Sequence, residues 1–303
     1  MFIKLVLKKI SPAWLLKAWR SYRYKPVDDR TLPDDKLMSL MRHEAHRIEK
    51  TIYNDILESK YDTYQEKKFR VDRIIKILIS RGYEQSHPVI DWAFKISNSF
   101  DDLEASFISV YSKTPEPLQL SKASEFSEFL QRRRSVRVWA ENQPDSNDLE
   151  VLALKVIDAA RWAPTSGNRQ PWRFKILTND ADKDLLAGIK ENHCTSAPIC
   201  IFVGMDTRLY GAFSDRETGI YIDAGAAIQN MILCAHSTGL GTCWNHFATD
   251  LIQSREANVK SYAVFTARLN IPDYIEPIAV VAIGYPEFIP PTPARMDVTE
   301  LIL

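Results

Sequence analysis

The stretch Pro164–Trp172 is the feature that most constrains the fold, because it requires a helix to end and a strand to begin within a short segment. Pro164 lacks a backbone N–H and disfavours helical geometry in the residue before it. Thr165–Asn168 then offers hydroxyl, amide and backbone hydrogen-bonding groups in a turn. Pro171 favours extended geometry at Gln170, and Trp172–Leu177 is predicted to be a strand. We interpret the stretch either as a turn that holds a polar, planar ligand or as an ordinary polar connection.

The chain before this stretch is predicted to be mostly helical. Apolar residues recur at helical spacing in residues 33–58, 64–81 and 88–111, and a further helix begins near Ser124. On the first of these helices His46 could pair with His43 or Glu49 as metal ligands. No third ligand is marked, so a solvated or ion-paired face is the preferred interpretation and no metal site is predicted. Residues 1–122 are therefore expected to form a helical extension, followed by a second domain over residues 123–303.

The second part of the chain alternates between helical and strand patterns. Asp145 or Ser146 is expected to cap a helix that runs towards Pro164. The continuous apolar run Ile199–Gly204 is typical of a central strand. A helix of small and apolar residues over 222–235 is expected to be buried, and further strands are expected from Thr242 and over 278–286. Strands interspersed with helices indicate an α+β or α/β fold.

Composition excludes some classes of protein and leaves others open. The 303 residues include 39 basic and 39 acidic side chains, a balance that argues against general nucleic-acid binding. The four cysteines form no C-x-x-C pair, so free thiols in a reducing, cytoplasmic compartment are expected. Residues 1–25 are basic, contain tryptophan and lack acids. This segment could lie on an anionic membrane surface or dock on protein, and both interpretations stay open.

Residues 131–139 place four arginines around a serine, in the order Gln-Arg-Arg-Arg-Ser-Val-Arg-Val-Trp. The planar guanidinium group matches phosphate oxygens, and a hydroxyl adds one more hydrogen bond. A solvated basic turn would have the same composition. The segment alone therefore predicts either phosphate binding or an exposed basic turn, with about equal weight.

Four motifs in this order resemble the flavin-dependent nitroreductase family. Arg133–Trp139 resembles the family's opening phosphate motif, and Ala163–Trp172 resembles its A-P-S-x-x-N-x-Q-P-W signature. Asp223–Trp244 resembles its core helix and the strand that follows a Gly-Leu-Gly turn. Gly284-Tyr285-Pro286 and Arg295 resemble its C-terminal end. The resemblance covers about residues 125–303, and the first 120 residues or so lie outside it.

The resemblance implies an α+β fold with a central mixed or antiparallel sheet packed by helices, and an intertwined homodimer that binds FMN at its interface. By this resemblance the phosphate and ribityl end would be held by Arg133, Ser135, Arg137 and Arg295, with Arg134 beside them through its backbone. The flavin ring and ribityl chain would meet Thr165, Ser166, Asn168 and Gln170, partly from the partner subunit. The backbone of Cys243, Trp244 and Asn245 would face the reactive part of the ring.

The expected activity is oxidoreduction in which NAD(P)H delivers hydride, leaves, and is replaced by a nitro, quinone or other small acceptor. The cofactor carries such chemistry, so the protein supplies orientation and hydrogen bonds. No catalytic side chain is assigned, and His246 is a weak candidate for a proton donor beside solvent. Two alternatives stay open. One is a specialised reaction of the wider superfamily, such as flavin fragmentation, dehalogenation or oxidation of peptide rings. The other is a non-enzymatic accessory protein at a membrane surface.

Overall fold

The computed structural model describes residues 28–53, 61–99, 117–187, 189–190, 192–210, 218–247 and 259–303. The interpretations of residues 1–25 lie outside this part of the chain. The protein divides into two compact units, Met1–Phe107 and Ile108–Leu303. Each unit is described by itself below. None of the helices in the described part is both long enough and apolar enough to cross a membrane.

The first unit is helical in its described residues, as the sequence pattern predicts. It contains η1 (Asp29–Thr31), α3 (Asp34–Tyr53), α4 (Tyr61–Ser80) and α5 (Pro88–Ser99). The inward faces of the three α-helices form one apolar core, whose fully buried members include Leu37, Met41, Ile48, Ile74, Leu78, Ile90 and Ile96. On the polar face of α3, His46 contacts the Glu49 carboxylate at 3.1 Å, in agreement with an ion-paired face.

A buried carboxylate fastens the start of the first unit to α4. Asp29 is 3% exposed, and its two oxygens lie 2.9 Å from Arg70 Nη2 and 2.6 Å from Arg73 Nη2. Burial by itself would raise the pKa of Asp29, but the hydrogen bonds and charges of the two arginines outweigh it and lower that pKa. The ion pairs therefore keep Asp29 ionised inside the fold.

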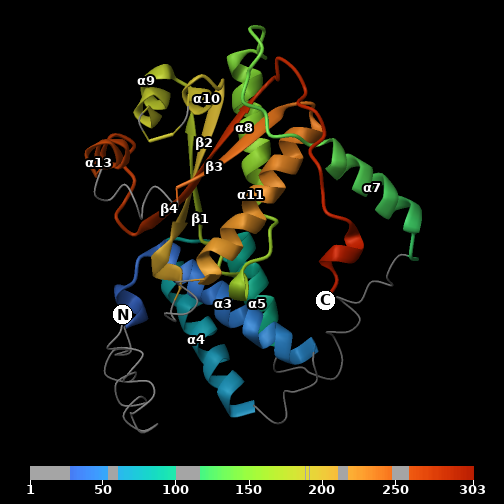
Figure 1. The fold of residues 1–303 in the computed structure, drawn as a ribbon. Coiled ribbons are helices and arrows are strands. Elements are labelled where there is room, and N and C mark those ends of the chain that lie inside the picture. Colours follow the sequence, from blue (N-terminus) through green and yellow to red (C-terminus); the bar gives the residue numbers. More distant parts are fainter. Residues whose placement is uncertain are drawn as a thin grey trace, which may run out of the picture. The chain divides into compact units, whose positions relative to one another are not determined.

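The second unit is built around a four-stranded antiparallel sheet (Figure 1). The strands lie in the order β1 (Trp172–Leu177), β2 (Ile199–Asp206), β4 (Ile275–Gly284) and β3 (Gly241–His246). Every residue of β2 is buried, so the apolar run over Ile199–Gly204 is an inner strand, as predicted. β3 forms one edge of this sheet.

Helices cover both faces of the sheet. On one face α8 (Ser146–Ala160) and α11 (Ile220–Ser237) pack on alternate residues of the strands (Figure 1). On the other face lie α10 (Asn192–Thr195) and α13 (Val259–Arg268), together with α9 (Asp180–Lys183) and η4 (Asp184–Leu186). This α+β arrangement confirms the predicted fold class.

The remaining elements are α7 (Leu120–Arg132), η3 (Ser166–Asn168), η5 (Thr207–Leu209) and η7 (Val298–Leu301). Two helices of this unit, α11 and α7, expose apolar side chains. α11 exposes Ile222 at 70%, so it is not enclosed on all sides as its composition predicted. α7 buries none of its side chains, although it carries Leu120, Phe126 and Leu130.

Candidate functional site

The arginine segment lies along the outer edge of β3. Val136 N donates to Thr242 O at 2.9 Å, and Ser135 forms a parallel bridge with Thr242. Gly241 permits this approach, because a Cβ atom added there would lie 2.5 Å from Val136 Cγ2. The backbone therefore carries the half-buried Arg133 and Arg134 to the edge of the sheet, where the sequence predicted a phosphate site.

Three of the predicted arginines come together at this edge. Burial, followed by the positive charges of Arg134 and Arg295, lowers the pKa of Arg133. Arg134 hydrogen bonds to the carbonyls of Gln131 and Arg133 and to the Thr292 hydroxyl, and so links the segment to the chain that carries Arg295. Like charges that converge in this way disfavour one another, so the cluster favours an anion between them.

One nitrogen of the cluster has no partner. Arg134 Nε is buried and makes no hydrogen bond. Within the described part of the chain no carboxylate pairs with the Arg133 guanidinium either. A buried, unsatisfied donor beside uncompensated cations is the arrangement expected where a multiply charged anion supplies the missing acceptors.

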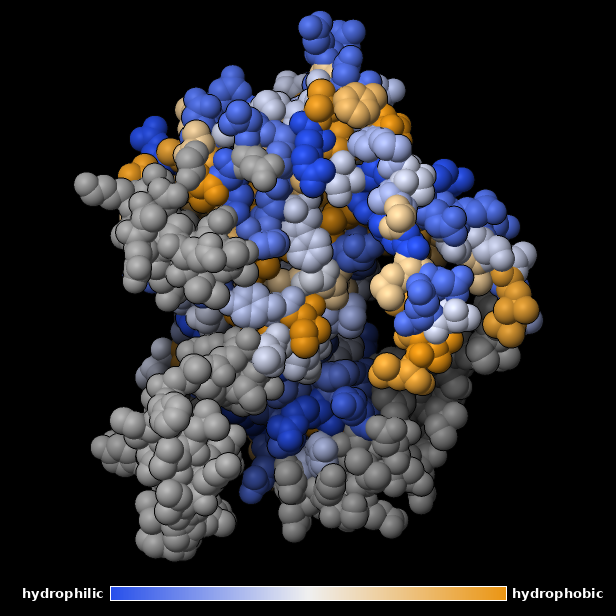
Figure 2. All heavy atoms as spheres, in the orientation of Figure 1, coloured by the Kyte–Doolittle hydropathy of each residue, from blue (hydrophilic) through white to orange (hydrophobic). Residues whose placement is uncertain are grey.

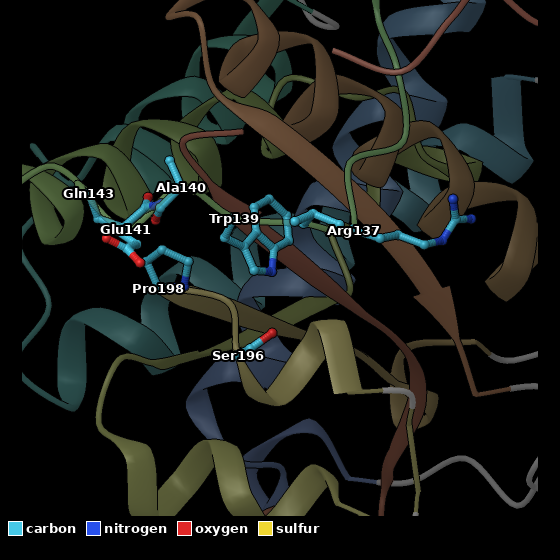
Figure 3. A pocket seen from close by; sticks show the side chains of 8 residues that line it. Arg137, Trp139, Ala140, Glu141, Gln143, Ser196 and Pro198 are labelled. Atoms are coloured by element: carbon cyan, nitrogen blue, oxygen red, sulfur yellow. The ribbon is translucent and has the colours of Figure 1, made fainter. Parts of the chain in front are cut away.

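Arg137 is placed differently from the other predicted arginines. It is exposed and borders a pocket of 440 Å³ (Figure 3). In this view its guanidinium extends away from the other labelled side chains. The pocket is lined by Arg137, Val138, Trp139, Ala140, Glu141, Gln143, Ser196 and Pro198. Gln143 is already used within the fold, since its side chain amide bonds the backbone of Tyr285 in both directions.

The outer edge of β3 offers the backbone groups of Trp244, which pair with no described residue. In an antiparallel strand, backbone groups point alternately towards each neighbour. Because Thr242 O faces Val136, the N–H and C=O groups of Trp244 and His246 also point outward. His246 O accepts from Lys190 Nζ at 2.6 Å. Trp244 lies between these two anchored positions, and its backbone is the part of the edge left for a ligand.

The turn between α8 and β1 lies where the sequence predicted it, but Gln170 is not extended, as was expected for the residue before Pro171. Gly167, Asn168 and Gln170 have φ values of 60°, 52° and 52°, a left-handed conformation that glycine and asparagine tolerate best. Gln170 Nε2 donates to Asn168 Oδ1 at 3.0 Å, and Gln170 N donates to Thr165 Oγ1 at 3.3 Å. The turn is therefore held by its own polar side chains before any ligand binds.

Three residues to which the sequence assigned no role hold this turn in place, namely Asp223, Arg169 and Tyr210. The buried Asp223 carboxylate of α11 accepts from Ser166 N at 3.0 Å and from the Tyr210 hydroxyl at 2.7 Å. Arg169 Nη1 donates to Ser166 O at 2.5 Å and to Ser166 Oγ at 2.9 Å, and its guanidinium lies 5.6 Å from the Tyr210 ring centroid. The Ser166 hydroxyl thus accepts from Arg169, and its own proton can be donated to a ligand.

The predicted residue Asn245 turns to the opposite face of β3 from Trp244. Its Oδ1 lies 2.8 Å from Nε2 of the buried His193, and its Nδ2 donates to Cys243 O at 3.0 Å. Cys243 is buried, whereas Trp244 and His246 are exposed. Of these four side chains, those of Trp244 and His246 are therefore the exposed ones.

Comparison with known proteins identifies a family. The model of the Nitroreductase family matches residues 130–192 and 187–285, which together span more than half of the 303 residues. The chain is 30% identical over 169 residues to a "Putative NADH dehydrogenase/NAD(P)H nitroreductase" of Archaeoglobus fulgidus, covering 54% of this chain and 86% of that relative. A protein of the same description from Methanothermobacter thermautotrophicus is 29% identical over 176 residues, covering 56% and 82%.

Solved structures also resemble part of the chain. One from Parabacteroides distasonis, with the same description, is 26% identical, covers 59% of this chain and 96% of its own, and has a TM-score of 0.47. Another, from Desulfovibrio desulfuricans, is described as a "putative nitroreductase in complex with fmn". It is 25% identical, covers 63% and 97%, and has a TM-score of 0.48.

Proposed function

Since the chain belongs to the Nitroreductase family, we propose that this FMN-dependent oxidoreductase passes hydride from NAD(P)H to a nitro, quinone or other small acceptor by a ping-pong mechanism. Both relatives named above are described as NADH dehydrogenase/NAD(P)H nitroreductase proteins. When bound, FMN supplies the two-electron chemistry. The acceptor and the ping-pong order are our proposal.

The observation that carries this proposal is the arginine cluster beside the open edge of β3. The phosphate of FMN is a dianion, so it can accept from the buried Arg134 Nε and offset the charges of Arg133 and Arg295. The unpaired backbone of Trp244 lies on the same strand edge that Ser135 and Val136 join. The residues present thus fit a ligand with a phosphate at one end and a hydrogen-bonding ring at the other.

The predicted residues would divide the work according to their chemistry. Arg133, Arg134 and Arg295 would hold the phosphate, with Ser135 and Arg137 as further candidates. The turn would hold the ring and ribityl groups through Thr165, Ser166, Asn168 and Gln170. Of Cys243, Trp244 and Asn245, it is Trp244 whose backbone groups would face the ring, because those of its two neighbours point towards β4. Left-handed geometry at three positions of the turn fixes these donors in advance, which limits the ordering needed on binding.

No described side chain is assigned as the proton donor to the acceptor. His246 is exposed on the outward face of β3 and remains a weak candidate, with solvent as the simpler source. If His246 only positions substrate, its substitution would alter KM and kcat but leave the pH dependence of kcat in place. If His246 donates the proton, its substitution would remove that pH dependence. Substitution of His246 therefore separates the two sources through the pH profile of kcat.

We also propose a homodimer through the second unit. Apolar side chains are exposed along α7, on the outer side of α8 and at the C-terminal end, where Figure 2 shows hydrophobic surface over α7 and the end of the chain. They include Leu120, Phe126, Leu130, Val151, Leu154, Met296, Val298, Leu301 and Ile302. Several apolar residues on neighbouring elements of one unit mark a surface that another protein covers.

The absorbance spectrum of the purified protein tests the cofactor. We expect flavin bands in the native protein and release of FMN on denaturation, at about one per chain. A colourless protein that releases no flavin would overturn the proposal. Bound FMN without turnover of NADH or NADPH with nitroaromatics and quinones would instead favour a specialised superfamily reaction.

A further inference from the structure

Two side chains from the segment that precedes β2 reach the end of β3. Lys190 Nζ donates to His246 O at 2.6 Å. His193 belongs to α10, is 8% exposed, and places its Nε2 2.8 Å from Asn245 Oδ1. The two contacts therefore meet successive residues of β3, one from the strand's outer edge and one from the sheet face that α10 covers.

The neighbouring contacts fix which atoms donate. Asn245 Nδ2 donates to Cys243 O at 3.0 Å, and this sets the orientation of the amide. Its Oδ1 therefore faces His193, and because an amide oxygen only accepts, His193 Nε2 carries the proton. The position of α10 is fixed in turn by Trp139, whose Nε1 donates to His193 O at 2.9 Å.

Within the described residues, the outer edge of β3 has fewer restraints than the edge that pairs with β4. It is joined to the arginine segment only at Thr242. The register with β4 continues to His246, opposite Ala279, and Phe247 N then donates to Ile278 O at 2.7 Å. Trp244, the residue whose backbone faces outward, is followed at once by the two residues that Lys190 and His193 hold.

We propose that His193 and Lys190 are positioning residues that set the orientation of the Trp244 backbone towards the flavin ring. The inference rests on the proposed function, since it requires a flavin ring to bind at this edge of β3. Loss of the His193 donor leaves the Asn245 oxygen with only the weak Cys243 thiol donor at 3.9 Å, which favours a turn of the amide and a shift of the strand end. A displacement of the strand by a fraction of an ångström is enough to change both catalysis and the flavin environment.

Substitution at position 193 tests this in the holoenzyme. His193→Leu removes the donor, whereas His193→Gln keeps an N–H group that can reach the same oxygen. We expect His193→Leu to shift the visible flavin bands and the midpoint potential and to lower kcat about tenfold, with a smaller effect on FMN affinity. His193→Gln should restore most of both properties, which a purely structural role would not predict.

Lys190→Met provides a second variant, because Lys190 is only partly buried and its loss should leave the fold intact. It should shift the flavin bands in the same direction as His193→Leu. Thr195→Ala is the matched control, since the Thr195 hydroxyl bonds Asn192 O within α10, and its flavin spectrum should stay unchanged. Wild-type spectra and kcat in both His193→Leu and Lys190→Met would overturn the inference alone. A wild-type protein without flavin would overturn the proposed function and the inference with it.

Discussion

The proposed phosphate site rests on two groups, Arg134 Nε and the Arg133 guanidinium. Each is a cation held at the edge of β3 without a described carboxylate, and Arg134 Nε is buried without an acceptor. Burial of an unsatisfied donor costs free energy, which the binding of an acceptor returns. The cluster therefore costs folding free energy when it is empty, and a bound phosphate would offset that cost.

Arg133→Ala should weaken FMN binding by about 10- to 100-fold, because one charge-assisted hydrogen bond contributes about 1.5–3 kcal/mol. The measurement is the dissociation constant of FMN from fluorescence titration of the apoprotein. Arg132→Ala is the control, since Arg132 is an exposed arginine one position earlier. Equal affinities of the two variants would place the phosphate elsewhere.

Asp223 shows what single residues contribute to the shape of the turn. Its carboxylate accepts from Ser166 N and from the Tyr210 hydroxyl, and its backbone carbonyl accepts from Trp172 Nε1 at 3.4 Å. Asp223→Ala should destabilise the protein by about 2–4 kcal/mol and weaken FMN binding, because buried donors lose their acceptor. Tyr210→Phe should cost only about 1 kcal/mol. Thermal melts paired with FMN titrations check both values, and a stable Asp223→Ala variant with wild-type affinity would contradict the role.

At the scale of elements, local pattern predicted the regular parts of the second unit. β1 has the predicted bounds, since Pro171 precedes a run of alternating side chains, and α8 begins after the predicted cap Asp145. The short helices α9 and α10 were not predicted, because a single turn carries no periodicity. The support of the site was also missed. Asp223 and Ser166 lie 57 positions apart, and only the packing of α11 brings them together.

The candidate site was predictable where a residue type suits a ligand directly. The convergence of Arg133, Arg134 and Arg295 followed the motif. The roles of Arg169 and His193 could not be found in this way, because their partners are set by tertiary contacts. Their residue types gave a weak signal, since a buried charge or imidazole requires a partner.

The three-helix arrangement of the first unit should lose stability in acid. The pKa of Asp29 is lowered in the folded protein, so the stabilisation is present above the unfolded-state pKa of about 3.9 and is lost as pH falls through the folded value. The protection factors for amide hydrogen exchange in α3 and α4 should therefore fall below about pH 4. Asp29→Asn should have faster exchange already at pH 7, as expected when a buried ion pair loses one partner. Unchanged exchange in that variant would show that the ion pairs contribute no stability.

At the scale of the whole molecule, the boundary between residues 122 and 123 stays a prediction. A fragment of residues 117–303 keeps α7 and every described residue of the second unit. It should fold and bind FMN with an affinity within about threefold of the full chain, because none of the candidate cofactor residues lies before Arg133. Circular dichroism and FMN titration of the fragment check this. An unfolded fragment would show that the first residues are needed for the second unit to form.

The proposed dimer predicts that charge on α7 separates the subunits. Phe126→Glu combined with Leu130→Glu should shift the sedimentation coefficient to that of a monomer, because a buried charge opposes an apolar interface. FMN affinity should fall with it, since part of the site is expected from the partner. Lys122→Glu alters an exposed charge on the same helix and should leave the dimer intact. A double variant that still sediments as the wild type would move the interface away from α7.

Helix α7 has 13 residues and fully buries none of them, although the half-buried Phe129 packs on His236 of α11. A helix of that length is only marginally stable by itself in water. Until a second copy covers it in the proposed dimer, a newly made chain would present an apolar and partly ordered segment to chaperones and proteases. Pairing depends on the square of the concentration of unpaired chains, whereas degradation depends on its first power. The amount of protein that accumulates in a cell would then rise more steeply than its rate of synthesis.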